Sequence, residues 1–262
     1  MKKLSKKNTT LLLSLICVVQ LLASLYWIGQ KNFLFFDEVF SFPAANGTWE
    51  VEFTENEWLD EEWYLDYMTV DEENRFDYSI PYRNQVKDVH PPLFYIFLNT
   101  ACSFMPGEFS FYAGTAFNVV FFLICTISLY FLGKEVFDDK VCGLLPAFLY
   151  ALSYGGINTM VYIRMYMLLT LMVILHTLVY LKYFEKEIVP VKGYVFLALT
   201  LLGGVLSQYY FLFAAFFFGV WYTIKFFVKK RYKILVCYLA TIFASAVCSL
   251  MIWPAMLQHL FG

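Results

Sequence analysis

Long apolar runs separated by short polar segments dominate the chain. The first run extends from Leu11 to Ile28, and others fill most of the sequence after residue 110. A membrane-spanning helix needs about 20 predominantly apolar residues, so the pattern predicts an all-α protein that crosses a membrane repeatedly. We expect about seven spans, at residues 10–29, 111–133, 141–158, 163–183, 192–208, 210–228 and 233–253.

Residues 31–110 interrupt this pattern. Residues 31–90 hold 15 of the 21 acidic residues and only four basic residues, which marks a segment that faces water. The apolar stretch 92–105 is about 14 residues long, which is short for a span, so we expect it to lie at the membrane surface. The chain therefore divides into a first transmembrane helix (1–30), a large outer loop with juxtamembrane helices (31–110) and about six further transmembrane helices (111–262).

Basic residues set the expected orientation. Lysines cluster between residues 2 and 7, before the first apolar run, and a second basic cluster occupies residues 229–233. Loops rich in lysine and arginine stay in the cytoplasm. We therefore expect the N-terminus and residues 229–233 inside, with the acidic loop and the C-terminus outside, in a multi-pass protein of the plasma membrane.

The composition agrees with this class. The chain is 60% hydrophobic and 21% aromatic, with a mean hydropathy of +0.61, which is far from the balance of a soluble domain. No basic stripe or nucleic-acid-binding motif occurs, which argues against a nucleic-acid partner. The expected environment is the lipid bilayer.

Candidate chemistry lies at the two ends of the acidic loop and at one later position. Asp37 and Glu38 follow the first span, and His90 directly precedes two prolines and the short apolar stretch. Arg164 stands at the start of a later span, where an arginine is costly to bury. This position favours a function such as binding an anion, although an arginine that reaches back to the membrane surface is the simpler alternative.

These positions carry a resemblance to a known family. The chain resembles the GT-C membrane glycosyltransferases, specifically glycosyltransferase family 39, the group that includes the protein O-mannosyltransferases and the lipid A aminoarabinose transferases. The resemblance implies an enzyme that transfers a sugar from a polyprenyl-phosphate donor to an acceptor on the outer face, usually with inversion. It also implies a further C-terminal part, which we expect to be missing here. The matching motifs are Asp37-Glu38-x-x-Ser41, Asp88-x-His90-Pro91-Pro92-Leu93-Phe94-Tyr95, Leu132-Gly133-Lys134 and Arg164-x-Tyr166-x-Leu168.

The resemblance implies roles for individual residues. Asp37 is the expected general base, because a hydroxyl acceptor loses a proton as it attacks the anomeric carbon. Glu38 is expected to orient the acceptor, bind a metal or support the base. The leaving phosphate requires positive charge, which Arg164 is the first candidate to supply. The other candidates are Lys87, Arg83 and His90 for the donor phosphate, and Tyr166, Tyr95, Gln208 and Tyr209 for the donor and acceptor pocket.

Simpler interpretations stand beside several of these assignments. Lys87 and Arg83 are equally well explained as ordinary loop charges, His90 as a structural residue, and Tyr209 as part of an interfacial aromatic girdle. A divalent cation stays open as a cofactor, although no spaced His/Cys cluster predicts a metal site. The aromatic residues of the loop, Trp49, Trp58, Trp63, Tyr64 and Tyr67, form either a platform for the acceptor or the packing face of a helix.

Two other functional classes compete with the transferase. An inactive truncated relative, acting as the partner subunit of such an enzyme, would keep the same motifs. A transporter is less well supported, because it should show inverted repeats and charged residues at mid-membrane. The sequence shows no repeat, and its notable charges gather at one face. The sequence specifies neither the sugar nor the acceptor.

Overall fold

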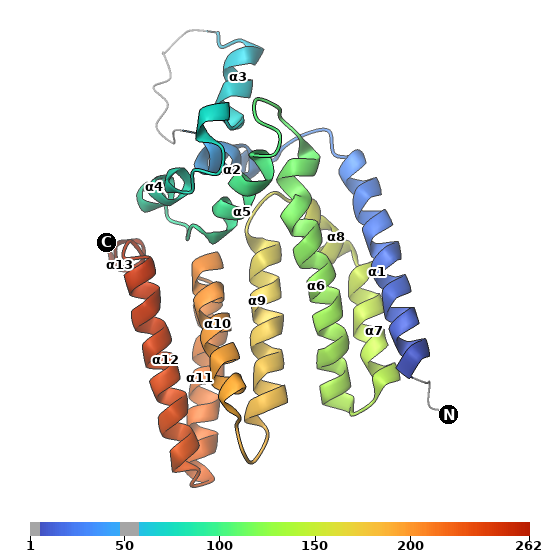
Figure 1. The fold of residues 1–262 in the computed structure, drawn as a ribbon, viewed down its shortest axis with the longest axis vertical. Coiled ribbons are helices and arrows are strands. Elements are labelled where there is room, and N and C mark those ends of the chain that lie inside the picture. Colours follow the sequence, from blue (N-terminus) through green and yellow to red (C-terminus); the bar gives the residue numbers. More distant parts are fainter. Residues whose placement is uncertain (1–5, 48–57) are drawn as a thin grey trace.

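The computed structural model describes residues 6–47 and 58–262, and every regular element in these ranges is a helix. Long helices stand side by side in a bundle, and shorter helices cover one end of it (Figure 1). The bundle contains α1 (Lys6–Gly29), α6 (Phe111–Phe137), α7 (Lys140–Ala151), α8 (Tyr154–Val161), α9 (Tyr166–Val179) with its π-helical continuation η2 (Tyr180–Phe184), α10 (Val191–Ser207), α11 (Phe211–Val228) and α12 (Tyr232–Ile252). The shorter helices, called the cap below, are α2 (Phe36–Asn46), α3 (Glu61–Met68), η1 (Glu72–Asn74), α4 (Ser79–Lys87) and α5 (Leu93–Cys102), and the chain ends in α13 (Met256–Phe261).

Several bundle helices have the length and composition of membrane spans. In the described ranges, five helices qualify, namely Lys7–Gly29, Phe111–Phe137, Tyr166–Phe184, Phe211–Val228 and Tyr232–Ile252. The helix α10, at 17 residues, and α5, at 10 residues, are apolar but shorter. The all-α class is confirmed, and the helices are compatible with a polytopic membrane protein. The expected number of about seven spans is not reached by these five helices alone.

The expected span 141–158 is not one straight helix, although the two helices that form it are together long and apolar enough for a broken span or a re-entrant loop. The chain forms two helices there, α7 and α8, whose axes differ by 54°. The break falls at Leu152–Ser153, where the Ser153 hydroxyl accepts a hydrogen bond from the Gly156 backbone nitrogen and so caps the start of α8. A serine in this position favours a new helix start over a continuous helix. The single apolar run therefore forms two helices with a bend between them.

The outer faces of the bundle are apolar. On α11, Phe213, Phe216 and Phe217 are each more than half exposed, and Trp221 is 64% exposed. A soluble monomer rarely exposes contiguous apolar surface of this extent. Contact with lipid chains accounts for these side chains without any cost of exposing them to water.

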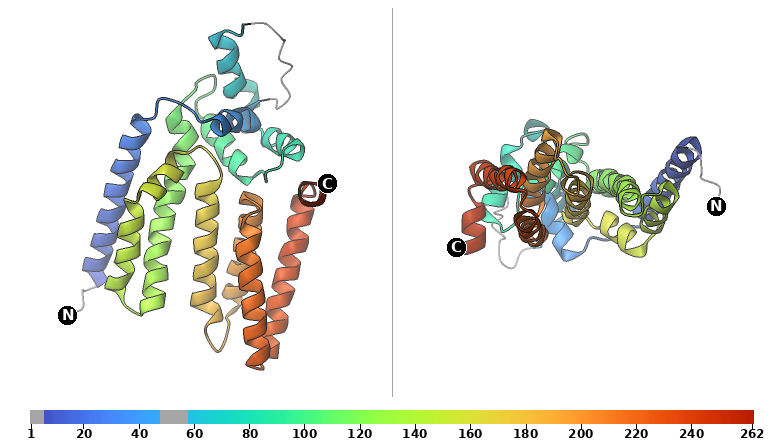
Figure 2. Two further views of the ribbon diagram at one scale, coloured as in Figure 1. Left: turned by 180° about the vertical axis from the view of Figure 1, so that it is seen from behind. Right: turned by 90° about the horizontal axis from the view of Figure 1, so that it is seen from below.

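Two buried clusters hold the bundle together. One joins α2 and α5 of the cap to α6 and α9, through residues such as Phe42, Tyr95, Phe122 and Leu168. The other lies among η2, α10, α11 and α12. Seen along the helices, the bundle is elongated, with α1 at one end and α12 at the other (Figure 2). The first cluster is the one that positions the cap over the start of α9.

The two ends of the bundle differ in charge. The cap and α13 lie at one end, whereas the turn between α11 and α12, with its basic cluster 229–233, lies at the other (Figure 1). The N-terminal end of α1 is also at the end opposite the cap (Figure 1). The cap and the basic cluster thus lie at opposite ends of the bundle, as the orientation expected from the basic residues requires.

Cysteine labelling in intact cells checks the orientation. The six cysteines are first replaced, and then Asp77→Cys in the cap and Lys229→Cys between α11 and α12 are made separately. We expect a membrane-impermeant maleimide to label the Asp77 variant in intact cells, and the Lys229 variant only after permeabilisation, since basic loops stay inside. Labelling of the Lys229 variant in intact cells would contradict the orientation.

Candidate functional site

Glu38 is the structural anchor of the site. It lies in the first turn of α2, its side chain is fully buried, and Lys31 forms an ion pair with it at 2.9 Å. Its Oε2 accepts from the Phe35 backbone nitrogen at 2.8 Å, and its Oε1 from the Ile163 backbone nitrogen at 2.7 Å. The carboxylate therefore joins the end of α1, the start of α2 and the α8–α9 connection. With both oxygens bonded and no exposure, Glu38 does not face an acceptor or a metal, contrary to those two expected roles.

Replacing Glu38 by Gln is expected to destabilise the protein. Removing one partner of a buried ion pair leaves the other charge uncompensated, which typically costs about 3–5 kcal/mol, and here the Lys31 side chain is only 8% exposed. A thermal melt of the detergent-purified protein measures the effect as a lower Tm. The double variant Glu38→Gln/Lys31→Met should recover part of the loss. An unchanged Tm for Glu38→Gln would show that the pair contributes little.

Arg164 lies at the centre of the site, between α8 and α9. It is 7% exposed, and its Nη1 donates to the Asp37 carbonyl at 3.2 Å. The same nitrogen lies 3.4 Å from the Ser41 hydroxyl and 3.4 Å from the Tyr95 hydroxyl. The expected proximity of Arg164 to the start of α2 is therefore present in the structure, and Tyr95 lies in the same cluster.

The partners of Arg164 leave its charge uncompensated. In the described part of the chain, no carboxylate lies within ion-pair distance of the guanidinium, and its Nε has no hydrogen-bond partner. A buried cation normally has an anionic partner, because removing charge from water is expensive. Among the described residues, the Arg164 guanidinium therefore has hydrogen-bond partners but no direct ion pair.

His90 supports Arg164 from the cap. The His90 Nε2 lies 3.3 Å from Arg164 Nη2, and its Nδ1 lies 2.8 Å from Asp88 Oδ2. Since a guanidinium nitrogen only donates, Nε2 is the accepting nitrogen and Nδ1 carries the proton that it donates to Asp88. His90 is therefore neutral in this arrangement and orients the guanidinium.

Asp88 completes this chain of hydrogen bonds. Burial acts to raise its pKa, but the hydrogen bond from His90, the backbone hydrogen bond from Val89 and the positive charge of Arg164 outweigh burial, so that the pKa lies below its usual value. With the Gln85 amide oriented to satisfy its neighbours, its nitrogen donates to Asp88 Oδ2 at 3.2 Å and to the His90 carbonyl at 3.1 Å. Asp88 is thus held as a carboxylate, which keeps the proton on His90 Nδ1.

Asp37 is the exposed carboxylate of the site. Its Oδ2 accepts a hydrogen bond from the Tyr162 hydroxyl at 3.1 Å. Burial, followed by the hydrogen bond to Asp37, raises the pKa of Tyr162 to about 12, so the phenol stays protonated and donates. The Tyr162 ring lies parallel to that of Tyr166, with centroids 6.0 Å apart. Asp37 is therefore held on one side and open to solvent on the other.

The sequence analysis did not identify two residues of this cluster, Tyr162 and Gln85. Tyr162 lies two positions before Arg164, so the segment reads Tyr-x-Arg-x-Tyr, and this symmetry was the available signal. Gln85 lies on α4 and gave no signal, because a glutamine in a polar helix is ordinary. Both act on residues that the sequence did single out.

Four of the expected site residues lie elsewhere. Arg83 and Lys87, on α4, line a polar cavity between α2, α3 and α4. Gln208 and Tyr209 lie between α10 and α11, where the Tyr209 hydroxyl contacts His259 Nδ1 and Trp253 Nε1, both at 2.9 Å. The structure therefore does not join these four residues to the cluster around Arg164.

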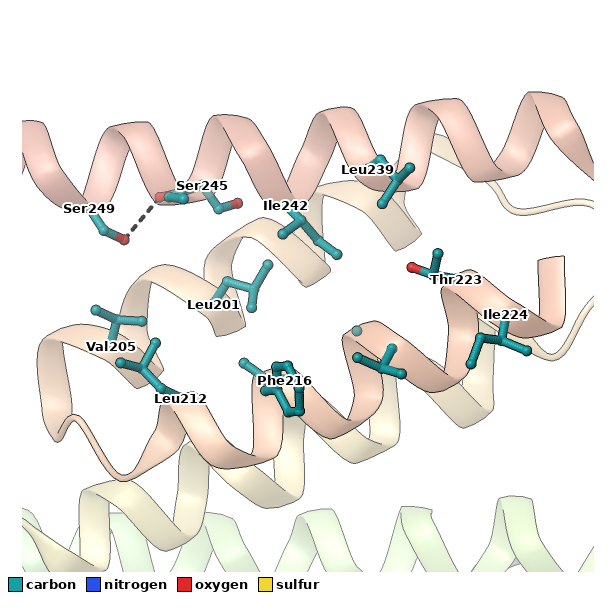
Figure 3. Close-up of a pocket in the computed structure, with 14 residues that line it drawn as sticks. Leu201, Val205, Leu212, Phe216, Thr223, Ile224, Leu239, Ile242, Ser245 and Ser249 are labelled. Carbon is teal, nitrogen blue, oxygen red and sulfur yellow. Dashed lines mark hydrogen bonds between the residues drawn. The ribbon is translucent and has the colours of Figure 1, made fainter. Parts of the chain in front are cut away.

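An apolar groove opens among α10, α11 and α12 (Figure 3). Its volume is about 600 Å³, and Leu201, Phe216 and Ile242 are among its lining residues. The hydroxyls of Ser245 and Ser249 also line it, but they donate to the backbone of their own helix at 2.8 and 2.9 Å. The groove thus presents an almost entirely hydrocarbon surface.

The described residues provide no set of side chains that could bind the divalent cation considered in the sequence analysis. Among the residues that the structure describes, no group of three or more His, Cys, Asp or Glu side chains is placed to hold a metal ion. Glu38, which the sequence analysis considered as a possible metal ligand, is bonded to Lys31 and to two backbone nitrogens.

Comparison with known proteins adds no relative. No family model, no curated protein and no solved structure significantly matches the chain.

Proposed function

We propose that this protein is a membrane glycosyltransferase that moves a sugar from a polyprenyl-phosphate donor to a hydroxyl acceptor at the cap end of the bundle. The observation that carries the proposal is the pairing of a buried, uncompensated arginine with an exposed carboxylate. Arg164 donates to the backbone carbonyl of Asp37, so a group bound by the guanidinium lies beside the Asp37 side chain. The resemblance of these motifs to those of the GT-C enzymes, stated from the sequence, points to the same reaction class.

The geometry suits a displacement at an anomeric carbon. The acceptor oxygen attacks this carbon, the bond from the carbon to the phosphate oxygen breaks, and the phosphate leaves with the electron pair. Asp37 takes the proton of the acceptor through Oδ1, because Tyr162 already donates to Oδ2. Arg164 stabilises the negative charge that develops on the phosphate, and an arginine offers a phosphate two parallel donors.

Tyr162 and His90 serve as positioning residues in this scheme. Tyr162 fixes the rotamer of Asp37, and His90 fixes the guanidinium of Arg164. Because His90 accepts from Arg164 and donates to Asp88, it has no proton to offer a phosphate. We therefore assign His90 to orientation and Arg164 to contact with the donor.

The bundle also offers an apolar surface to the lipid part of the donor. The groove among α10, α11 and α12 is hydrocarbon-lined (Figure 3), and α11 and α12 have the length and composition of membrane spans, whereas α10 is apolar but shorter. Isoprenoid chains partition into such surfaces because burial removes apolar area from water. A donor with its chain along the bundle and its phosphate at the cap end fits this layout.

Turnover of defined donors tests the proposal. The protein is reconstituted into vesicles with a panel of polyprenyl-phosphate-linked hexoses, pentoses and aminosugars, together with membrane extract as the acceptor source. Mass spectrometry should detect release of polyprenyl phosphate with at least one donor. Donor binding without any release would favour the inactive partner subunit, and transbilayer movement of an intact solute would favour a transporter.

A further inference from the structure

The cap contains a second polar site that the proposed reaction does not use. A cavity of about 530 Å³ lies between α2, α3 and α4, and every residue of its lining is at least nine positions along the chain from Asp37. Its polar lining consists of Asn46, Asp66, Tyr67, Thr69, Asp71, Asn74, Arg83, Asn84 and Lys87. Such a cavity, polar and built from several elements, has the usual features of a small-ligand site.

The walls of the cavity are fixed by hydrogen bonds between the elements. Asn84 on α4 donates to the Gly47 carbonyl at 2.7 Å, and Asn46 on α2 donates to the Met68 carbonyl at 3.0 Å. Asn99 on α5 donates to the Ala45 carbonyl at 3.0 Å, which ties the same end of α2 to the body of the cap. The cavity is therefore a preorganised feature rather than a gap between loose segments.

One buried atom in the lining lacks a partner. Asn46 is 2% exposed, and its Oδ1 is buried without a hydrogen-bond partner, although its Nδ2 is bonded. This oxygen has no accessible surface, so recognition of a ligand in the cavity rests on the other polar groups of the lining.

The charges of the lining indicate the kind of ligand. Arg83 and Lys87 supply two positive charges, and Asp66 and Asp71 supply two negative charges, so the net formal charge is zero. A polyphosphate would meet the two carboxylates, and a polyamine would meet the two cations. Closely spaced donors and acceptors instead suit a ligand whose groups both donate and accept, as hydroxyl groups do.

An aromatic wall adds to this chemistry. Tyr67 lines the cavity, and the Trp63 ring stacks on it with centroids 5.4 Å apart and planes 15° apart. Rigid aromatic rings give large apolar contact and keep a polar edge. Saccharides combine many hydroxyl groups with small apolar faces, so they match both parts of the lining.

The helix α2 relates this cavity to the reaction site. Asp37 is at its first turn and Asn46 at its last residue, and at 1.5 Å per residue the two are about 14 Å apart. On the other side, Lys87 lines the cavity and the next residue, Asp88, belongs to the Arg164 cluster. One ligand that reaches both places must be extended.

We propose that this cavity binds the distal part of an oligosaccharide acceptor, whose terminal hydroxyl then lies at Asp37. The assignment as acceptor rests on the proposed transferase function, whereas binding of a saccharide in the cavity does not depend on it. The bound units would hold the acceptor in place, and the unit nearest Asp37 would be glycosylated. Arg83 and Lys87 thereby contact the acceptor instead of the donor phosphate.

Binding to a saccharide array tests this site directly. The full chain, purified in detergent, is applied to immobilised neutral and aminated oligosaccharides of two to six units, with heparin fragments and acidic peptides as other ligand classes. We expect at least one oligosaccharide to be retained. Asp66→Asn and Arg83→Ala should each weaken its binding about 10-fold, the effect of losing a hydrogen bond to a charged group. Both side chains are exposed, so these variants should fold normally, which a thermal melt checks.

Matched variants separate the two proposals. Glu62→Gln removes a carboxylate one helical turn before Asp66, outside the cavity lining, and should bind as the unchanged chain does. Retention of no oligosaccharide, preference for heparin or peptide, or equal binding by all variants would overturn the site. Saccharide binding that is lost in the cavity variants, in a protein that never releases polyprenyl phosphate, would refute the transferase and leave the site standing.

Discussion

Replacing Asp37 by Asn is expected to lower the rate of sugar transfer about 10²–10⁴-fold, the usual loss when a general base is removed. The amide keeps the size of the side chain and still accepts the hydrogen bond from Tyr162, so folding and donor binding should change little. The rate is measured as polyprenyl phosphate released per unit time from a donor that the unchanged protein uses.

A control variant and a graded variant sharpen this prediction. Glu61→Gln removes another exposed carboxylate of the cap and should leave the rate unaltered. Tyr162→Phe removes the group that orients Asp37, so it should lower kcat less than Asp37→Asn and leave KM for the donor nearly unchanged. Near-normal turnover by Asp37→Asn would remove Asp37 from the role of base.

The second large effect concerns donor affinity. Arg164→Ala should weaken binding of a polyprenyl phosphate by about 10- to 100-fold, since hydrogen bonds to charged groups contribute about 1.5–3 kcal/mol. Arg164→Lys should lose less, because lysine keeps the charge but not the paired donors. Binding is followed by the quenching of intrinsic tryptophan fluorescence or by a competition assay with a labelled lipid.

The matching alcohol provides the control for Arg164. Polyprenol has the same chain without the phosphate, and its weaker binding should be equal in the unchanged protein and in both variants. Arg164 also bonds to Asp37 and lies by Tyr95, so a lower Tm is expected for Arg164→Ala, and affinity is compared below that temperature. Equal loss of phosphate and alcohol binding would indicate a structural role alone.

The helices were predictable to the extent that length and apolar composition determine them. The apolar runs became helices because each could satisfy its own backbone hydrogen bonds, and the short stretch 92–105 became α5, in the cap at one end of the bundle. The bend between α7 and α8 was missed, since one serine cap within an apolar run determines it. A mean hydropathy over many residues is hardly changed by one serine. The hydrogen bond of that serine nevertheless ends one helix and starts the next.

The site was predictable where a residue type was out of place in its surroundings. Arg164 in an apolar run and the carboxylate of Asp37 next to a span were both anomalous, and the structure brings them into contact. Glu38 was equally anomalous, but its pairing with Lys31 and the Ile163 backbone depends on the three-dimensional path of the chain. Gln208 and Tyr209 were placed at the correct end of a helix, but the Tyr209 hydroxyl bonds to Trp253, just after α12, and to His259 on α13, and so belongs to another network.

A cryo-electron microscopy structure of the Asp37→Asn variant with a bound polyprenyl-phosphate sugar tests the central claim most directly. The account predicts that the phosphate lies within hydrogen-bond distance of the Arg164 guanidinium, with the sugar beside residue 37 and Tyr162. The basic cluster 229–233 at the other end of the bundle is the competing place for a phosphate. Density for the phosphate at that cluster, with Arg164 still bonded only to Asp37, His90 and its other protein neighbours, would contradict the account.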